Sequence, residues 1–424
     1  MTTDTPRPAN RALVLAMLLL VYTFNFLDRQ ILSILAQPVK ASLALTDTQL
    51  GMLGGLAFAA LYSTLAIPLA LLADRTSRSW VIALSLGVWS VFTALCGTAQ
   101  SFGQMFACRL GVGVGEAGGV APSYALIGDY YPAKTRARAL SIYSLGIPVG
   151  AAAGALLGGY IAQTVEWRSA FLAVGVAGLL LAPAFKWIVR DRPRAVAPVD
   201  QVPITHVFGI LAAKPSFWLL AFGAAAGSMC GYGVAFWLPS MIMRNYGLGL
   251  SQTGQFFGAL LLSGGVAGIV LGGWLGDRLG ARGRRWYALF PAICYVVGTP
   301  LFIAGVLAGS WQAAFALFLL PQALVYVWLG PVLTAVQHLV PAHMRATASA
   351  SFLLINNLIG LGLGSWAIGS LSDHLAPAYG TDALRYAIAT GLCLYLVGGA
   401  LMALASRFLT RDWVEGGQGL ESSV

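Results

Sequence analysis

The chain has 424 residues and a formal net charge of +10, and 58% of its residues are hydrophobic while only 9% are charged. Soluble domains contain about 25% charged residues, so this composition excludes an ordinary soluble globule, which would lack polar groups for its surface. The five cysteines are scattered singly along the chain, which argues against a disulfide framework or a metal site. We predict a polytopic membrane protein with no cofactor and no metal.

Apolar runs long enough to cross a bilayer, about 18 residues or more each, recur along the whole chain. We predict twelve membrane-spanning helices, at residues 11–36, 49–73, 80–99, 102–127, 139–163, 169–188, 216–242, 251–276, 287–308, 311–337, 347–371 and 384–409. The fold class that we predict is therefore an all-α polytopic membrane protein.

Lys and Arg residues concentrate in alternate loops. If both termini lie inside the cell, nineteen of these residues fall in inner segments and four in outer segments: Lys40, Arg168, Arg244 and Arg385. Loops rich in Lys and Arg stay cytoplasmic, so we predict cytoplasmic termini. Because the basic residues are spread over short loops and form no single face, we predict no nucleic-acid partner.

Two loop motifs occur twice. The Asp-Arg pair at 74–75 recurs at 277–278, and PAKTRARA (132–139) shares five of eight positions with PAHMRATA (341–348). Both offsets are near half the chain length, which indicates duplication of a six-helix unit. Six is an even number, so the two repeats run parallel, and in such proteins the substrate site lies at the repeat interface near mid-membrane. We expect an N-terminal bundle, a cytoplasmic linker and a C-terminal bundle with a short tail, at 1–188, 189–215 and 216–424.

Four ionisable residues lie well inside the predicted spans: Asp28, Arg29, Arg109 and Glu116. Each costs at least about 2.5–3.5 kcal/mol at the centre of a lone helix, so each should face a partner or a cavity. Asp28 and Arg109 lie at similar depth, which permits an ion pair, and Arg29 can compete for either carboxylate. These residues either act only as structural ion pairs, or the carboxyls exchange protons or bind a cation while the arginines bind a phosphate or swap partners.

The stretch RLGVGVGEAGG (109–119) contains the Gly-x-Gly-x-x-Gly spacing of a dinucleotide-binding turn. That turn needs a preceding strand and an acidic residue about 20 positions onward. Here we predict one continuous span, and position 138 is an arginine. We therefore interpret the glycines as surfaces for close helix packing.

The predicted spans of the second half contain only neutral polar groups, so we expect a cavity with one charged wall and one apolar, aromatic wall. The alternative for the aromatic residues is that they face lipid or the bundle core. The residues that we expect at the cavity are Asn25, Tyr143, Phe236, Trp237, Tyr326, Trp328, Asn356 and Asn357.

The chain resembles the major facilitator superfamily of transporters over essentially its whole length. The family's loop motif Gly-x-x-x-Asp-Arg-x-Gly-Arg-Arg is matched at Gly273, Asp277, Arg278 and Gly280, and less fully around Asp74. FNFLDRQILSIL (24–35), RLGVGVGEAG (109–118) and YYPAKTRARALSIY (130–143) are similar to the spinster-like branch. The resemblance implies a proton-coupled carrier of lysophospholipids or sphingosine phosphate in the cytoplasmic membrane of a bacterium.

The resemblance also implies that charged loops latch the two halves together on the cytoplasmic side when the carrier opens outward. The corresponding residues here are Asp74, Arg75, Arg78, Asp129, Arg136, Asp277, Arg278 and Arg345. For the arginines, the alternative is that they only set the topology of the chain.

We therefore predict a secondary transporter, not an enzyme, that works as a monomer among membrane lipids. It would move an amphipathic anionic lipid by alternating access, with proton coupling. The alternatives are a drug or small organic anion exporter of the same fold and, in other classes, an intramembrane enzyme or a passive channel. An enzyme would need a convergent nucleophile, base or metal set, and no His lies mid-span.

Overall fold

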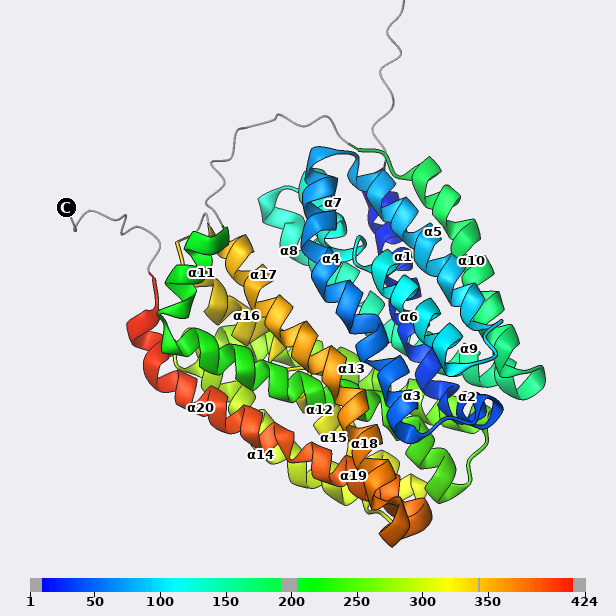
Figure 1. The fold of residues 1–424 in the computed structure, drawn as a ribbon. Coiled ribbons are helices and arrows are strands. Elements are labelled where there is room, and N and C mark those ends of the chain that lie inside the picture. The colour runs from blue at the N-terminus through cyan, green and yellow to red at the C-terminus, as the bar shows by residue number, and fades with distance from the viewer. Residues whose placement is uncertain (1–9, 192–203, 342–343, 415–424) are drawn as a thin grey trace, which may run out of the picture.

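The computed structural model describes residues 10–191, 204–341 and 344–414, and every regular element within these residues is a helix. Figure 1 shows that the helices coloured blue to cyan lie on one side of the molecule, and those coloured yellow to red lie on the other. Residues 192–203 of the predicted linker fall outside the described residues, as does the end of the chain at 415–424.

The first half comprises α1 (Arg11–Ile34), α2 (Ala36–Leu43), α3 (Asp47–Gly54), α4 (Leu56–Arg75), α5 (Arg78–Cys96), α6 (Phe102–Glu116), α7 (Val120–Tyr130), α8 (Ala133–Ser144), α9 (Gly146–Thr164) and α10 (Trp167–Ile188). The short helix α11 (Ile204–Ala212) precedes the second half.

The second half comprises α12 (Pro215–Tyr246), α13 (Leu250–Gly280), α14 (Trp286–Val306), α15 (Trp311–Leu324), α16 (Leu329–Gln337), α17 (Arg345–Asn356), the π-helical turn η2 (Asn357–Leu361), α18 (Gly362–Tyr379), the 3₁₀ turn η3 (Gly380–Asp382), α19 (Ala383–Leu392) and α20 (Leu394–Asp412).

Polar side chains define where several helices begin. The Asn10 side chain accepts a hydrogen bond at the start of α1, and Ser101 and Ser310 do the same for α6 and α15. Thr46 and Gln49 form a reciprocal capping box at the start of α3. These caps satisfy backbone N–H groups that have no partner inside the helix, so they fix the ends of the membrane-crossing segments.

The membrane-crossing stretches of the structure differ from the predicted spans at two places, and shorter breaks divide the spans 49–73, 139–163, 311–337 and 384–409 at Gly55, Leu145, Val325–Trp328 and Cys393. Ten helical stretches of the described residues are long and apolar enough to cross a membrane. The predicted span 102–127 is divided into α6 and α7, and the last two predicted spans form one apolar stretch, Thr347–Asp412. When α6 and α7 are counted as one further crossing and Thr347–Asp412 as two, the ten stretches become the twelve crossings of the predicted all-α fold.

The prediction of a continuous helix over 102–127 is wrong at Ala117–Gly119, where α6 ends and α7 begins. The amides of Gly118 and Gly119 turn back to the carbonyls three residues earlier, and not four as in an α-helix. The glycines before this turn do pack closely as expected: Gly111 lies against the Phe92 ring and Gly115 against Trp89.

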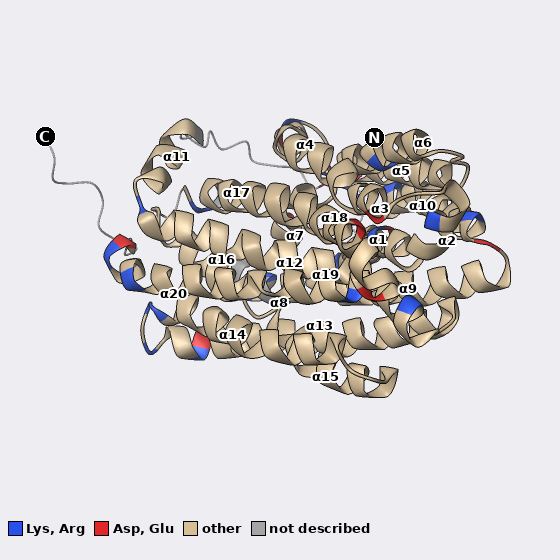
Figure 2. Ribbon diagram, turned by 60° about the horizontal axis from the view of Figure 1, so that its bottom comes forward, with Lys and Arg blue, Asp and Glu red and all other residues tan. Residues whose placement is uncertain are grey.

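The two halves meet mainly where α1 packs on α12, α9 on α13, and α18 on α3 and α4. Glycine permits the close approach of α9 to α13, since a Cβ at Gly159 would lie 2.6 Å from the carbonyl oxygen of Leu250. Figure 2 shows charged residues gathered mainly toward the ends of the helices, with long uncharged stretches between them. We call the end where α1 begins and α20 finishes the terminal end, and the other the far end.

Candidate functional site: a cavity between the two halves

A cavity of about 210 Å³ lies between the two halves. The first half contributes Arg29, Gln30 and Ser33 from α1, Phe58 from α4 and Arg109 from α6. Among the described residues that line the cavity, the two arginines are the only charged ones. The positive charge of this cavity therefore comes from the first half alone.

The second half contributes a mostly apolar wall. Phe236 from α12, Tyr326 and Trp328 line the cavity, as the sequence predicts, together with Tyr232 and Gln322, which the sequence analysis did not select. The cavity is thus charged on one side and aromatic on the other, which is the asymmetry of an amphipathic ligand.

Arg29 and Glu116 form an ion pair beside the cavity. The Nε of Arg29 donates to Oε2 of Glu116 at 2.7 Å, and the Glu116 side chain is fully buried. The guanidinium carbon of Arg29 also lies 4.6 Å from the ring centres of both Phe58 and Tyr62. Aromatic faces attract a cation, so the rings and the carboxylate together hold Arg29 beside the cavity.

Asp28 and Arg109 are close but not hydrogen-bonded. Their nearest atoms, Oδ2 of Asp28 and NH1 of Arg109, are 3.9 Å apart, which is too long for a hydrogen bond. Thr93 donates to the other oxygen of Asp28 at 2.8 Å. The side chain of Arg109 is only 2% exposed, and its Nε and NH1 have no hydrogen-bond partner within the described residues. Arg109 therefore keeps donor capacity at the cavity wall.

The two buried carboxyls are neighbours. Oδ2 of Asp28 and Oε1 of Glu116 lack a donor within the described structure, and the charges of the two groups act on one another. Repulsion between neighbouring carboxylates favours a proton on one of them, whereas the two arginines favour the ionised forms. All four charged residues that the sequence singled out thus belong to one cluster at the first-half wall.

Five residues that we expected at the cavity are not among its lining residues. Tyr143 stacks on Tyr22, and the Trp237 indole donates to the carbonyl of Ser365. Asn356 accepts from Ser228 and contacts its neighbour, and Asn25 is buried in α1. The cavity lining therefore does not include Asn25, Tyr143, Trp237, Asn356 or Asn357, and their role at a substrate stays a prediction. The sequence indicates which residues face the interior of a bundle but does not distinguish the bundle core from the wall of a cavity.

The predicted gate residues lie at the terminal end. Arg78 donates to Asp74 at 2.8 Å and to Asp129 at 2.5 Å, all within the first half. Arg136 donates to the carbonyls of Tyr131 and Gly128. The other predicted residues are Arg75, Asp277 and Arg278, which are exposed, and Arg345, which begins α17.

A second acidic site at the terminal end anchors the chain after α10. Ser77 and Ser79 donate side-chain hydrogen bonds to Asp191, and the Ser79 amide donates at 3.1 Å. Burial disfavours the charged form of Asp191, but these donors outweigh burial and hold the pKa of the carboxyl below its ordinary value. Lys186 donates to Ser79 and adds a positive charge nearby.

At the far end, two carboxylates join the halves, and the sequence analysis missed both. Asp47 of α3 accepts from Arg244 of α12 at 2.6 and 2.8 Å and from Ser372 of α18 at 2.7 Å. Asp373 of α18 accepts from the amides of Asp47 and Thr48. We call these residues, Asp47, Thr48, Arg244, Ser372 and Asp373, the far-end latch.

Comparison with known proteins agrees with this architecture. The family model described as Major Facilitator Superfamily matches residues 18–365. A protein of Mycolicibacterium smegmatis described as an MFS-type efflux pump is 33% identical over 97% of this chain and 96% of its own length. Protein spinster homolog 3 of Danio rerio is 25% identical over 94% of this chain and 86% of its own length.

Two solved structures of a bacterial homologue of the human lysosomal transporter spinster are also similar. One is described as inward-facing and unoccupied, with a TM-score of 0.86, and the other as inward-facing and occupied, with a TM-score of 0.83. Both are 29% identical in sequence and cover 96% of this chain and 99% of their own.

Proposed function

Because the chain belongs to the Major Facilitator Superfamily, we propose that it is a secondary transporter that moves an anionic amphipathic lipid by alternating access. A lysophospholipid or a sphingoid phosphate has the required chemistry. The observation that carries the proposal is the unpaired donor capacity of Arg109 at the wall of a cavity whose opposite side is aromatic. Guanidinium binds phosphate through paired, charge-assisted hydrogen bonds, and the aromatic side suits an alkyl chain.

The carboxyl pair supports proton coupling. With both carboxyls ionised, the cluster of Asp28, Arg29, Arg109 and Glu116 has no net charge. With one proton shared between the carboxyls, its net charge is +1, and an anionic headgroup is then attracted. Proton and anion binding therefore favour one another by linkage, which is the condition for moving both in one step.

The far-end latch supports an assignment of the two ends of the molecule to the two sides of the membrane. It holds the halves together at the far end, and the similar spinster homologue structures are described as inward-facing. We assign the terminal end to the cytoplasm, in agreement with the distribution of Lys and Arg, and we place the protein in the cytoplasmic membrane of a bacterium as a monomer. The residues around Asp74 and Asp277 would then approach when the carrier opens outward.

Uptake into proteoliposomes tests the proposal. Purified protein is reconstituted, and uptake of radiolabelled lysophospholipid and sphingosine phosphate is measured with and without a pH gradient. We expect saturable uptake that the gradient changes and that Arg109→Gln reduces strongly. Absence of lipid uptake from wild-type protein that retains its fold would refute the proposal. Ion conduction at channel rates would indicate a passive pore instead.

A second candidate is the export of drugs or small organic anions. The 33% identity to a protein described as an MFS-type efflux pump favours it. The same liposomes distinguish the two, since a drug panel would then be transported while lysophospholipids would neither be moved nor compete.

A further inference from the structure

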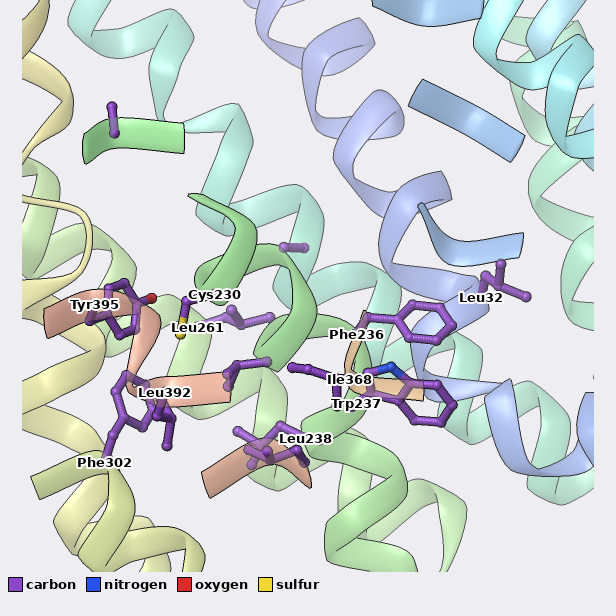
Figure 3. Close-up of a cluster of buried hydrophobic side chains, with 14 of the residues drawn as sticks. Leu32, Cys230, Phe236, Trp237, Leu238, Leu261, Phe302, Ile368, Leu392 and Tyr395 are labelled. Atoms are coloured by element: carbon purple, nitrogen blue, oxygen red, sulfur yellow. The ribbon is translucent and has the colours of Figure 1, made fainter. Parts of the chain in front are cut away.

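The cavity does not end at the interface between the halves. Its lining includes Phe302 of α14 and Tyr395 of α20, and these two helices pack on each other, with α20 also against α12. Phe302 is 1% exposed and Tyr395 is 2% exposed, so both belong to the interior of the second bundle. Figure 3 shows Tyr395 and Phe302 on one side of the green α12 ribbon, and Phe236 and Trp237 on the other.

The cavity therefore passes α12 and enters the second half. From the lining of the cavity we group Gly227, Gly231, Leu238, Leu261, Phe302 and Tyr395, which all belong to the second half, and we call this group the side slot. No charged residue of the described structure is among them. The slot is continuous with the part of the cavity that contains Arg29 and Arg109, so one molecule can contact both regions.

Two glycines of α12 face the slot, and they differ in the space around them. A Cβ at Gly227 would meet the ring of the buried Tyr295 at 2.5 Å, so this glycine permits tight packing. A Cβ at Gly231 would have one near neighbour, the hydroxyl oxygen of Tyr395 at 3.1 Å. Gly231 therefore leaves open space beside α12, and a larger side chain there would occupy the slot.

We propose that the side slot receives the alkyl chain of the transported lipid and that Gly231 determines how much of the chain can enter. This inference rests on the proposed function, which supplies the headgroup at Arg109. An alkyl chain has no polar group that needs a partner, and the slot offers aliphatic and aromatic carbon. Each methylene buried in such a site contributes about fourfold to affinity, so slot depth translates into chain-length preference.

A chain-length series tests this inference. Lysophosphatidylglycerols with one headgroup and saturated chains from decanoyl to octadecanoyl are compared by initial uptake rate into proteoliposomes. For Gly231→Leu we expect the ratio of octadecanoyl to decanoyl uptake to fall about tenfold or more, because the added side chain displaces several methylenes. Decanoyl uptake should change little. Gly87→Leu is the matched control, since a Cβ at Gly87 of α5 meets nothing within 4 Å.

A variant with the opposite expected effect on chain-length preference distinguishes a change in the slot from misfolding. Leu261→Ala enlarges the slot, and we expect it to raise the ratio of octadecanoyl to decanoyl uptake. Equal loss at every chain length for Gly231→Leu, or an unchanged ratio in both variants, would overturn the slot while leaving the proposed function in place. Failure of wild-type protein to move any of these lipids would refute the proposed function, and the slot assignment would fall with it.

Discussion

The guanidinium of Arg29 and the carboxylate of Glu116, 87 positions apart in the chain, meet at 2.7 Å beside the cavity between the halves. The contact joins α1 to the end of α6, next to the turn that separates α6 from α7. Asp28 lies close to Glu116, and Arg109 lies close to Asp28. A change of protonation at Glu116 therefore acts on a site that also offers donors to an anion.

Replacing Glu116 with glutamine should remove most of the pH dependence of transport. Glutamine can still accept from Arg29 but cannot release a proton. Uptake measured across a range of pH in proteoliposomes should give a flat profile, with folded yield within about twofold of wild type because the hydrogen bond is kept. Glu166→Gln, at an exposed position before α10, is the control. A pH profile that Glu116→Gln leaves unchanged would eliminate this carboxyl as the coupling group.

Replacing Arg109 with glutamine should weaken binding of anionic lipids about tenfold to a hundredfold, which corresponds to the loss of a charged hydrogen bond. The variant also leaves Asp28 without its neighbouring cation, so the double variant Asp28→Asn/Arg109→Gln is measured beside it. We expect the double variant to recover folded yield but not anion affinity, determined from competition by sphingosine phosphate. Recovery of affinity in the double variant would show that Arg109 serves only to neutralise Asp28.

The fold and the charged cluster could be predicted from the sequence, and the reasons are physical. A charge such as Arg109 or Glu116 is conspicuous inside an apolar run because its cost demands a partner. The lining of the cavity could not be read in the same way: Phe236 faces the cavity and Trp237, its neighbour, donates to a carbonyl in the second half. Both are apolar residues of one helix, and only the packing of the neighbouring helices distinguishes them.

The far-end latch was missed for a different reason. Asp47 begins α3, and Asp373 lies just beyond the predicted span 347–371. Polar residues are ordinary at both places, and nothing local indicates that the two meet. Their contact joins residues 326 positions apart. The break between α6 and α7 was missed because glycine spacing predicts close packing without indicating where the helix stops.

Lowering the pH should loosen the attachment of Asp191 to the start of α5. Because the pKa of Asp191 is held below its ordinary value in the folded protein, its stabilising effect is present above the ordinary pKa, about 4. It is lost as the pH falls through the lower, folded-state pKa. Hydrogen exchange of the Ser79 amide, corrected for intrinsic rate, should accelerate in that range. Asp191→Ala should show fast exchange already at neutral pH, and equal protection in both proteins would contradict the assignment.

Weakening the far-end latch should shift the carrier toward opening at that end. Asp47→Asn removes the charge that Arg244 and Lys40 contact, and Asp373→Asn weakens the cap on α3. Loss of about one charged hydrogen bond changes a two-state equilibrium about tenfold.

The measurement uses spin labels at positions 163 and 251, whose native residues are in contact across the halves. After the native cysteines are replaced, the labels report the distance between the two halves at the far end. The control is Asp382→Asn, because Asp382 accepts from Asn245 within the second half. If the distance distributions of Asp47→Asn and Asp373→Asn are the same as that of the control variant, the latch does not hold this end closed.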